Sequence, residues 1–171
     1  MHRAYCKFVN SPLGSVSLFA TDKGLILVKI GAELNTISGG TLASDIKFAG
    51  ENDVLKLAEV ELNEYFEGRR KYFTVNLDIS GSEFDMDVWD AAKSIPYGET
   101  RSYCWLSEQI GRPKAYRAVG GALSRNPTPI FIPCHRVIRS DGGLGGYSAG
   151  LRVKRLLLKF EKEGKLDPND L

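Results

Sequence analysis

Cysteine and histidine are scarce in this sequence. The chain of 171 residues has three cysteines, Cys6, Cys104 and Cys134, and two histidines, His2 and His135. Three widely separated cysteines are too few for a disulfide framework, so we expect a reducing, intracellular compartment and a cytoplasmic protein. A structural zinc cluster needs about four cysteine or histidine ligands. The shortage of both residues therefore predicts that no metal is bound.

Long apolar runs are also missing. No segment approaches the roughly 20 apolar residues of a membrane-spanning helix, and Met1–Arg3 is not followed by the apolar core of a signal peptide. Hydrophobic residues make up 43% of the chain and charged residues 26%, as in an ordinary globular protein. We therefore expect no membrane association and a chain long enough to bury its own core.

The net charge of +2 conceals an uneven distribution of charge. Between Arg101 and Arg155, ten basic residues are opposed by two acidic ones, Glu108 and Asp141. A block dominated by arginine is typical of a surface that binds a polyanion, because the planar guanidinium suits phosphates. The alternative is an ordinary solvated face, which a charge run alone does not exclude.

The first part of the chain, residues 1–80, is predicted to form a small α/β domain. Alternating apolar residues between turn-forming residues predict strands, and apolar residues at helical spacing followed by Gly68 predict a helix. The predicted strands are Ala4–Val9, Val16–Ala20, Leu25–Ile30 and Tyr72–Ile79, the helix is Asp53–Glu67, and Glu33–Gly50 is mostly loop. Ser80–Ser82 is the predicted linker to the next domain.

The second part, residues 81–171, is predicted to be mainly helical, which places the whole chain in the α+β class. The predicted helices are Phe84–Ser94, Ser102–Ile110, Ala115–Ser124 and Leu151–Gly164. The second and third have helix-turn-helix spacing, with glycine in the turn. The third contains Gly120 and Gly121, each of which costs a helix about 1 kcal/mol relative to alanine. Close approach to DNA and close packing against a neighbouring helix are equally good reasons for this composition.

The most informative segment runs from Asn126 to Val137 and places Cys134 beside His135 and Arg136 after a proline-rich approach. The prolines restrict the backbone angles, so the thiol is held in one position. A thiol with a pKa of about 8.5 becomes a strong nucleophile when basic or cationic neighbours favour its thiolate. On the cysteine and histidine alone, a small buried packing residue is the commoner alternative.

Several segments together resemble the O6-alkylguanine-DNA alkyltransferases, also called methylated-DNA–protein-cysteine methyltransferases. They are Tyr103, Lys114–Leu123 with Arg117, Asn126-Pro127, the Ile-Pro-Cys-His-Arg-Val sequence of Ile132–Val137, and Gly145–Ser148. The resemblance extends from Phe84 to about Glu163, and its Pro-Cys-His-Arg-Val motif is highly specific. For the N-terminal domain, which resembles the family only in length and layout, it implies a ribonuclease-H-like fold without a catalytic role.

The resemblance implies a DNA repair protein that moves the alkyl group of O6-alkylguanine to Cys134 by direct displacement. His135 would act through a water molecule as the base for the thiol, and Glu161 would orient His135. Asn126 would connect the DNA-reading helix to the active-site strand, and the Tyr103 hydroxyl would serve guanine N3. Because the thioether product is not hydrolysed, we expect a single turnover and no cofactor.

The resemblance also implies how the damaged base is held. The Ser148 amide would donate to O6, the Cys134 and Val137 carbonyls would accept from the exocyclic amine, and Tyr147 would cover the base. The base must leave the duplex, and Arg117 would fill the vacated space. The residues implied to contact DNA are Arg101, Ser102, Tyr103, Lys114, Ala115, Arg117, Ala118, Gly120, Gly121, Arg125 and Arg136.

The expected partner is double-stranded DNA that contains O6-alkylguanine, bound by a monomer, while activity on O4-alkylthymine is left open. Binding is expected to weaken with salt and to be nearly independent of the surrounding sequence. Two features depart from the family pattern. Tyr116 is bulkier than the small residue expected beside Arg117, and the zinc ligands of some family members are missing from the N-terminal part.

Two other classes of function remain open on the residues themselves. A cysteine hydrolase would need a histidine that reaches the thiol from elsewhere in the fold, and besides His135 the chain offers His2 alone. A reader of alkylated DNA would bind the lesion and leave it alkylated. Such readers can lack the nucleophile, whereas this chain retains Cys134.

Overall fold

The computed structural model describes residues 4–31 and 48–166, and the chain divides into two compact units, Met1–Ile79 and Ser80–Leu171. The α+β class predicted from the sequence is confirmed, since the first unit contains a four-stranded sheet and the second is mainly helical. Within the described ranges, no helix combines the length and the apolar character needed to cross a membrane.

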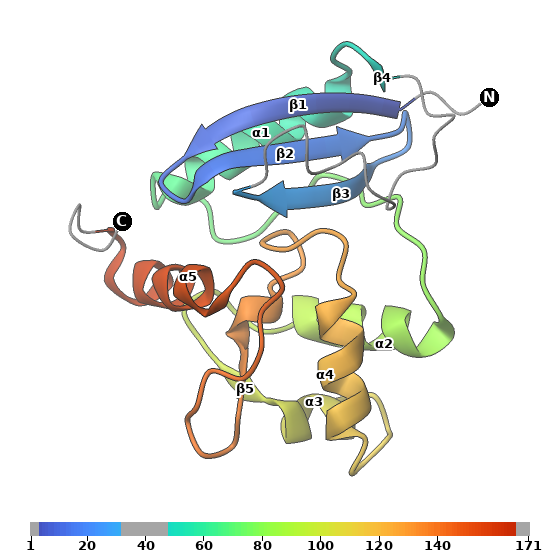
Figure 1. Ribbon diagram of the computed structural model, residues 1–171, viewed down its shortest axis with the longest axis vertical. Helices are drawn as coiled ribbons and strands as arrows, with labels where there is room; N and C mark the ends of the chain where they lie inside the picture. The colour runs from blue at the N-terminus through green and yellow to red at the C-terminus, as the bar shows by residue number, and fades with distance from the viewer. Residues whose placement is uncertain (1–3, 32–47, 167–171) are drawn as a thin grey trace. The chain divides into compact units, whose positions relative to one another are not determined.

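The N-terminal unit is built on a sheet with the strand order β3-β2-β1-β4. The strands are β1 (Ala4–Ser11), β2 (Gly14–Ala20), β3 (Leu25–Ile30) and β4 (Phe48–Ala49). The first three form an antiparallel meander, and β4 pairs with β1 in parallel (Figure 1). The three strands predicted before residue 31 are confirmed. The predicted loop is wrong at Phe48–Ala49, which form β4, and its part from 33 to 47 lies outside the described residues.

Helix α1 (Asp53–Phe66) packs across one face of this sheet (Figure 1). It begins where the Asn52 side chain accepts a hydrogen bond from the Leu55 amide at 3.0 Å, which satisfies one of the donors that the first helical turn leaves free. The fully buried apolar side chains are Leu55, Ala58, Leu62 and Tyr65. Residues three and four apart share one face of a helix, and the prediction of this helix from that spacing is confirmed.

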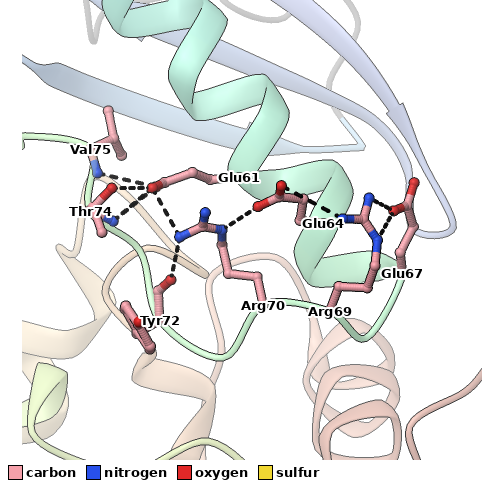
Figure 2. Close-up of polar contacts among 8 residues, drawn as sticks. All are labelled: Glu61, Glu64, Glu67, Arg69, Arg70, Tyr72, Thr74 and Val75. Atoms are coloured by element: carbon pink, nitrogen blue, oxygen red, sulfur yellow. Dashed lines mark hydrogen bonds and ion pairs between the residues drawn. The ribbon is translucent and has the colours of Figure 1, made fainter.

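The predicted strand Tyr72–Ile79 is wrong, because this segment makes one isolated bridge to β3 and no regular ladder. The backbone amides of Thr74 and Val75 donate instead to the carboxylate of Glu61, at distances between 2.9 and 3.1 Å (Figure 2). Arg70 pairs with the same carboxylate at 3.1 Å. A buried side chain of α1 thus takes the hydrogen bonds that a neighbouring strand would have made. An alternating apolar pattern does not reveal such a partner.

In its described residues the C-terminal unit contains four α-helices and a short parallel pair of strands. Its elements are α2 (Glu83–Lys93), β5 (Arg101–Ser102), α3 (Tyr103–Gln109), α4 (Tyr116–Ser124), η2 (Cys134–Arg136), β6 (Val137–Ile138) and α5 (Leu151–Glu163). All four helices predicted from the sequence are confirmed, with ends that differ by a single residue. Between α3 and α4 the chain turns through Lys114, which has a left-handed backbone with φ of 75°. This arrangement is the predicted helix-turn-helix.

Helix α4 packs against α2 and α3 through one apolar face (Figure 1). Val119, Ala122 and Leu123 are buried on this face, and the indole of Trp89 donates to the Ala122 carbonyl at 2.9 Å. The opposite side of α4 carries exposed polar residues. Helix α4 therefore has one side packed against the unit and one side exposed to solvent, called its open side below.

Candidate functional site

Cys134 begins the short helix η2 directly after Pro133. Its backbone amide donates to the Ile132 carbonyl at 2.8 Å, and the Arg136 amide donates to the Pro133 carbonyl at 3.0 Å. The thiol therefore lies on a tight turn and not on the expected strand, since β6 begins at Val137. The side chain is 4% exposed and lines a cavity.

Asn126 connects the end of α4 to the turn that carries the thiol. Its side-chain nitrogen donates to the Ile132 carbonyl at 3.0 Å and to the Cys134 sulfur at 3.1 Å, while its oxygen accepts from the Thr128 amide at 2.9 Å. A hydrogen bond donated to sulfur favours the thiolate over the thiol, because the thiolate is the better acceptor. This geometry is compatible with the connecting role predicted for Asn126, which remains a prediction.

His135 and Glu161 form a buried pair, with Nε2 of the ring 2.7 Å from Oε1 of the carboxylate. An ionised carboxylate only accepts hydrogen bonds, so Nε2 carries the proton and Nδ1 is the basic nitrogen of the ring. Nδ1 is buried and has no hydrogen-bond partner among the described residues. Burial lowers the pKa of His135, and although Glu161 opposes this shift, the ring is neutral at pH 7.

The Glu161 carboxylate is held in its ionised form. It accepts from the Gly98 amide at 3.1 Å and from Nε and Nη2 of Arg136 at 2.9 and 2.8 Å. Burial alone raises the pKa of Glu161, but the hydrogen bonds and charges of His135 and Arg136 outweigh burial and keep the pKa well below its usual range. An ionised Glu161 fixes both the orientation and the tautomer of His135.

Arg136 is not exposed to solvent as a DNA-contacting residue would be. Its side chain is buried, and its third nitrogen, Nη1, donates to the Ile95 carbonyl at 2.8 Å. All three nitrogens thus have partners inside the C-terminal unit, which leaves the guanidinium unavailable to a phosphate. The geometry therefore does not support the predicted DNA contact, and we assign Arg136 to holding Glu161 in place.

The thiol of Cys134 is protonated in the resting site. Burial raises the pKa of Cys134 to about 11, although the hydrogen bond from Asn126 and the charge of Lys154 act in the opposite direction. A thiol with this pKa is a poor nucleophile near pH 7, so any attack by the sulfur would first require a base to take its proton. His135 is the neutral base next to it in the chain.

A cavity of about 660 Å³ opens beside the thiol. The predicted site residues on its wall are Tyr103, Arg117, Gly120, Cys134, Tyr147 and Ser148. Its wall also includes residues that the sequence reasoning did not select, among them Cys104, Tyr116, Arg139 and Asp141. Asn126, His135 and Val137 are not on the wall and are buried.

Two tyrosines of the cavity wall keep their hydroxyl protons. Tyr103 lies against the glycine pair of the 145–146 loop, where a Cβ atom on Gly145 would collide with the Tyr103 hydroxyl. Burial raises the pKa of Tyr103, and a hydrogen bond from the Gly146 amide opposes it. Burial also raises the pKa of Tyr147 well above its usual value, and its ring lies edge-on to His135 with centroids 6.5 Å apart. Both hydroxyls can therefore donate hydrogen bonds near pH 7.

The glycine pair of α4 is not required by packing inside the unit. A Cβ atom on Gly120 would lie 3.8 Å from the Tyr103 ring, which is ordinary contact, and one on Gly121 would lie 3.3 Å from the movable end of Arg125. The close-packing alternative for these glycines is therefore not supported. Their open surface, next to the exposed Arg117 and Ala118, leaves room for a large ligand to approach the backbone.

The other residues predicted to contact DNA lie on the surface, and some of them already have ion-pair or hydrogen-bond partners within the protein. Arg101 pairs with Glu99 at 2.6 Å, and Arg125 pairs with Asp85 at 2.6 Å, so both ion pairs compete with phosphate. Ser102 caps α3 by accepting from the Trp105 amide at 3.0 Å. Lys114 is exposed in the helix-turn-helix turn, and Ala115 directly precedes α4.

Comparison with known proteins decides the family. Residues 83–163 match the family model of the 6-O-methylguanine DNA methyltransferase, DNA binding domain, and residues 4–79 match that of its ribonuclease-like domain. The methylated-DNA–protein-cysteine methyltransferase of Methanosarcina barkeri is 40% identical over 159 residues, which cover 92% of this chain and 97% of that protein. The chain belongs to the methylated-DNA–protein-cysteine methyltransferase family.

Further members of this methyltransferase family match along most of the chain. The one from Mycobacterium leprae is 42% identical over 158 residues, which cover 92% of each protein. The crystal structure of Mycobacterium tuberculosis OGT in complex with DNA has a TM-score of 0.83 at 38% identity, and the match covers 97% of this chain and 96% of that one. The family predicted from the Pro-Cys-His-Arg-Val motif is confirmed, and with it the ribonuclease-like fold of the N-terminal unit.

One buried residue of this methyltransferase fold was not selected by sequence reasoning. Lys154 of α5 is fully buried and donates to the carbonyls of Val137 at 2.5 Å and Gly146 at 3.1 Å. In the sequence it is one member of a basic block. Its spacing from Leu157 and Glu161 places all three on one face of α5, which is the signal that could have separated it from the exposed cations.

Proposed function

We propose that this protein repairs DNA by moving an alkyl group from guanine O6 to the sulfur of Cys134, once per protein molecule. The observation that carries the proposal is the position of the thiol on the wall of a cavity of about 660 Å³, adjacent in sequence to the base of a buried His135–Glu161 pair. A nucleophile, a neutral base and a group that orients the base are the parts that a displacement site needs. The Mycobacterium tuberculosis relative in complex with DNA supports DNA as the partner.

The proposed reaction begins with loss of the thiol proton. Nδ1 of His135 accepts it through a water molecule, and the hydrogen bond from Asn126 stabilises the thiolate. The sulfur attacks the alkyl carbon, so that the S–C bond forms while the C–O6 bond breaks and its electron pair passes to guanine. Guanine regains a proton at N1, which balances the proton that the thiol lost. The product thioether has no route back to a thiol.

The cavity wall, together with the buried Val137, is proposed to supply the groups that bind guanine. The Ser148 amide is proposed to donate to O6, and the Cys134 and Val137 carbonyls to accept from the exocyclic amine. The Val137 carbonyl already accepts from Lys154 at 2.5 Å, but an oxygen with two lone pairs can accept a second hydrogen bond. Tyr147 is proposed to cover the base, and the protonated hydroxyl of Tyr103 to serve N3 of the departing guanine.

The proposed DNA surface is the open side of α4 together with the turn before it. Arg117 is exposed and lines the cavity, so its side chain can occupy the space that the extruded base leaves in the duplex. We expect one protein monomer to bind double-stranded DNA at the O6-alkylguanine. A thiol that must stay reduced suits a reducing compartment such as the cytoplasm.

The experiment that tests this proposal is a mass measurement of the intact protein after incubation with a duplex oligonucleotide that carries one O6-methylguanine. We expect the wild type to gain a single methylene unit and the Cys134→Ala variant to gain nothing. The Cys6→Ala variant, changed in the N-terminal unit, serves as the matched control and should still gain the methylene unit. Trypsin locates the methyl group, because cleavage after Arg125 and Arg136 leaves Cys134 alone in peptide 126–136.

Two results would contradict the proposal. A protein that binds the lesion without gaining mass would be a reader of damaged DNA and not a repair protein. Methylation of Cys104, which is exposed and lines the same cavity, would retain the repair function but overturn the assignment of Cys134.

A further inference from the structure

Tyr116, the first residue of α4, is an exposed aromatic residue on the wall of the cavity. It is 43% exposed, whereas the other aromatic residues in the described part of the C-terminal unit are buried or half-buried. Its side chain makes no hydrogen bond or ring contact with another described residue. The fold of the unit therefore does not account for an aromatic residue at this position.

Tyr116 lies on the flank of α4 between the open side of the helix and the cavity. Residues four apart share one flank of a helix, and Tyr116, Gly120 and Ser124 all line the cavity. A helical side chain leans over the turn before its own Cα, so a side chain at position 120 would lie next to that of Tyr116. Glycine at this position has no side chain and leaves the Tyr116 ring accessible to a ligand.

The position of Tyr116 relative to the damaged strand follows from its neighbours on the cavity wall. Arg117, the next residue, is exposed and would fill the gap in the duplex, while the extruded guanine would lie in the cavity beside Cys134. The damaged strand must then pass from the open side of α4 into the cavity, along the flank that carries Tyr116. The nucleotide next to the lesion, which stays in the duplex, would therefore lie beside this ring.

An aromatic ring at this place suits the bases that remain in the duplex. Extrusion of the damaged guanine uncovers one face of each neighbouring base, and this loss of stacking opposes extrusion. A ring that stacks on an uncovered face offsets part of the loss, and it does so for any sequence because every base has a π-face. Tyrosine is suited to the edge of a cavity, since its ring is apolar while its hydroxyl can remain in water.

We propose that Tyr116 is a DNA-positioning residue, which stacks on the base next to the extruded O6-alkylguanine and holds the damaged strand at the mouth of the cavity. The inference rests on the proposed function, because it takes DNA as the partner and the cavity as the place of the damaged base. No bond forms or breaks at Tyr116. Its ring carries no charge, so it adds affinity without releasing counterions from the DNA. The bulky residue beside Arg117 thus adds a contact with the duplex and does not obstruct it.

The experiment measures the affinity of the protein for a duplex that carries one O6-methylguanine, with Cys134→Ala in every protein so that the lesion persists. Tyr116→Ala removes the ring and Tyr116→Phe keeps it. Tyr72→Ala, at a tyrosine of the N-terminal unit that is 73% exposed, is the matched control. Each protein is tested on the intact duplex and on duplexes in which the base on the 5′ or the 3′ side of the lesion is missing. Alanine favours a helix, so Tyr116→Ala should fold, and thermal melts check this.

We expect Tyr116→Ala to weaken binding to the intact duplex about tenfold, which is within the range for loss of a ring that stacks on a base. Tyr116→Phe and Tyr72→Ala should stay within about twofold of the reference protein. On one of the two duplexes with a missing base, Tyr116→Ala should have no effect, because the ring then has no base to stack on. The dependence of affinity on salt should be the same with and without the ring, whereas a lost phosphate contact would lower its slope by about 0.9.

Unchanged affinity in Tyr116→Ala would overturn the inference. So would a loss of affinity that persists on both duplexes with a missing base, since the ring would then contact the extruded guanine itself. Either result, beside methyl transfer by the wild type, would leave the proposed function intact. The expected loss of affinity in Tyr116→Ala, together with a wild type that takes no methyl group from the duplex, would instead overturn the proposed function and make Tyr116 a stacking residue of a damage reader.

Discussion

Among the described residues, each unit of the molecule holds one buried glutamate on a helix, Glu61 on α1 and Glu161 on α5. Glu61 accepts from the amides of Thr74 and Val75 and pairs with Arg70 (Figure 2). Its partners in the described chain are amides, one hydroxyl and one guanidinium, and none of these groups gains or loses a charge near neutral pH. Glu61 therefore fastens the segment after α1 to the helix.

Glu161 is bound in the same way with one addition. Like Glu61, it accepts from a backbone amide and an arginine, those of Gly98 and Arg136, but it also contacts the ring of His135. The second nitrogen of that ring is free to act as a base. The comparison shows that a buried carboxylate by itself anchors the chain. Glu161 differs from Glu61 in its contact with a titratable ring, and that ring is next in sequence to Cys134, the proposed nucleophile.

The largest effect is expected from Glu161→Gln, which removes the buried carboxylate of the C-terminal unit. An amide cannot stabilise a positively charged His135, so the rate of methyl transfer should fall on the order of 100-fold. The charge of the buried Arg136 would also lose its partner, at a cost of about 3–5 kcal/mol in the free energy of unfolding. Single-turnover methyl transfer and urea unfolding measure the two effects. An unchanged transfer rate in a folded variant would show that Glu161 only anchors the chain, as Glu61 does.

The matching change in the other unit, Glu61→Gln, should separate stability from activity. We expect the free energy of unfolding to fall by about 1–3 kcal/mol, because one oxygen that accepts from Thr74 and Val75 becomes a donor. The methyl-transfer rate of the folded variant should stay equal to that of the wild type. Glu64→Gln, whose carboxylate is partly exposed, is the control and should change stability less. A large loss of transfer with Glu61→Gln would remove the distinction between the two glutamates.

A smaller effect concerns acid stability. The folded-state pKa of Glu161 is lowered, so its contribution to stability is fully present above its ordinary pKa of 4.5 and is lost as the pH falls below it. The difference in unfolding free energy between the wild type and Glu161→Gln should therefore be constant near neutral pH and shrink in acid, by about 1.4 kcal/mol for each unit of pKa depression. Urea unfolding at a series of pH values measures this difference. A difference that does not depend on pH would show that Glu161 gains nothing from its charged partners.

The smallest effect is expected at the surface end of the cluster in Figure 2. Arg69 pairs with Glu67 and, at 3.7 Å, with Glu64, but its side chain is 62% exposed. Arg69→Ala should therefore change the free energy of unfolding by less than about 1 kcal/mol. Urea unfolding beside Glu61→Gln gives the comparison. A loss as large as that of Glu61→Gln would mean that the surface pairs, and not the buried carboxylate, hold the segment after α1.

Local patterns in the sequence were sufficient for most of the fold. The strands before residue 31 and all five α-helices follow from the spacing of apolar residues and from the turn residues between them. The failure at Tyr72–Ile79 has a specific cause, because the amides of Thr74 and Val75 bind the Glu61 side chain of α1. Spacing reports which side chains are buried, but it does not report which partner satisfies a backbone amide.

The residues of the candidate site could be predicted from the sequence where they are close together in the chain. Cys134 and His135 are neighbours, and the family motif around them points to Asn126 and Tyr103. Arg136 was predicted to contact DNA from the family resemblance, whereas the structure buries its guanidinium against Glu161. The sequence does not show that the guanidinium of Arg136 binds Glu161, which follows more than 20 residues later in the chain.

The sequence by itself determined the helices, the first three strands, the cysteine that lies in the family motif, and the family to which the chain is similar. Each of these depends on residue type and short-range spacing. Only the tertiary structure decided the state of the charges. It buries Lys154 with no counter-charge among the described residues, pairs Glu161 with both the His135 ring and the Arg136 guanidinium, and uses Glu61 as an anchor. The physical reason is that the energy of a charge depends on what surrounds it in space, and those surroundings come from segments distant in the chain.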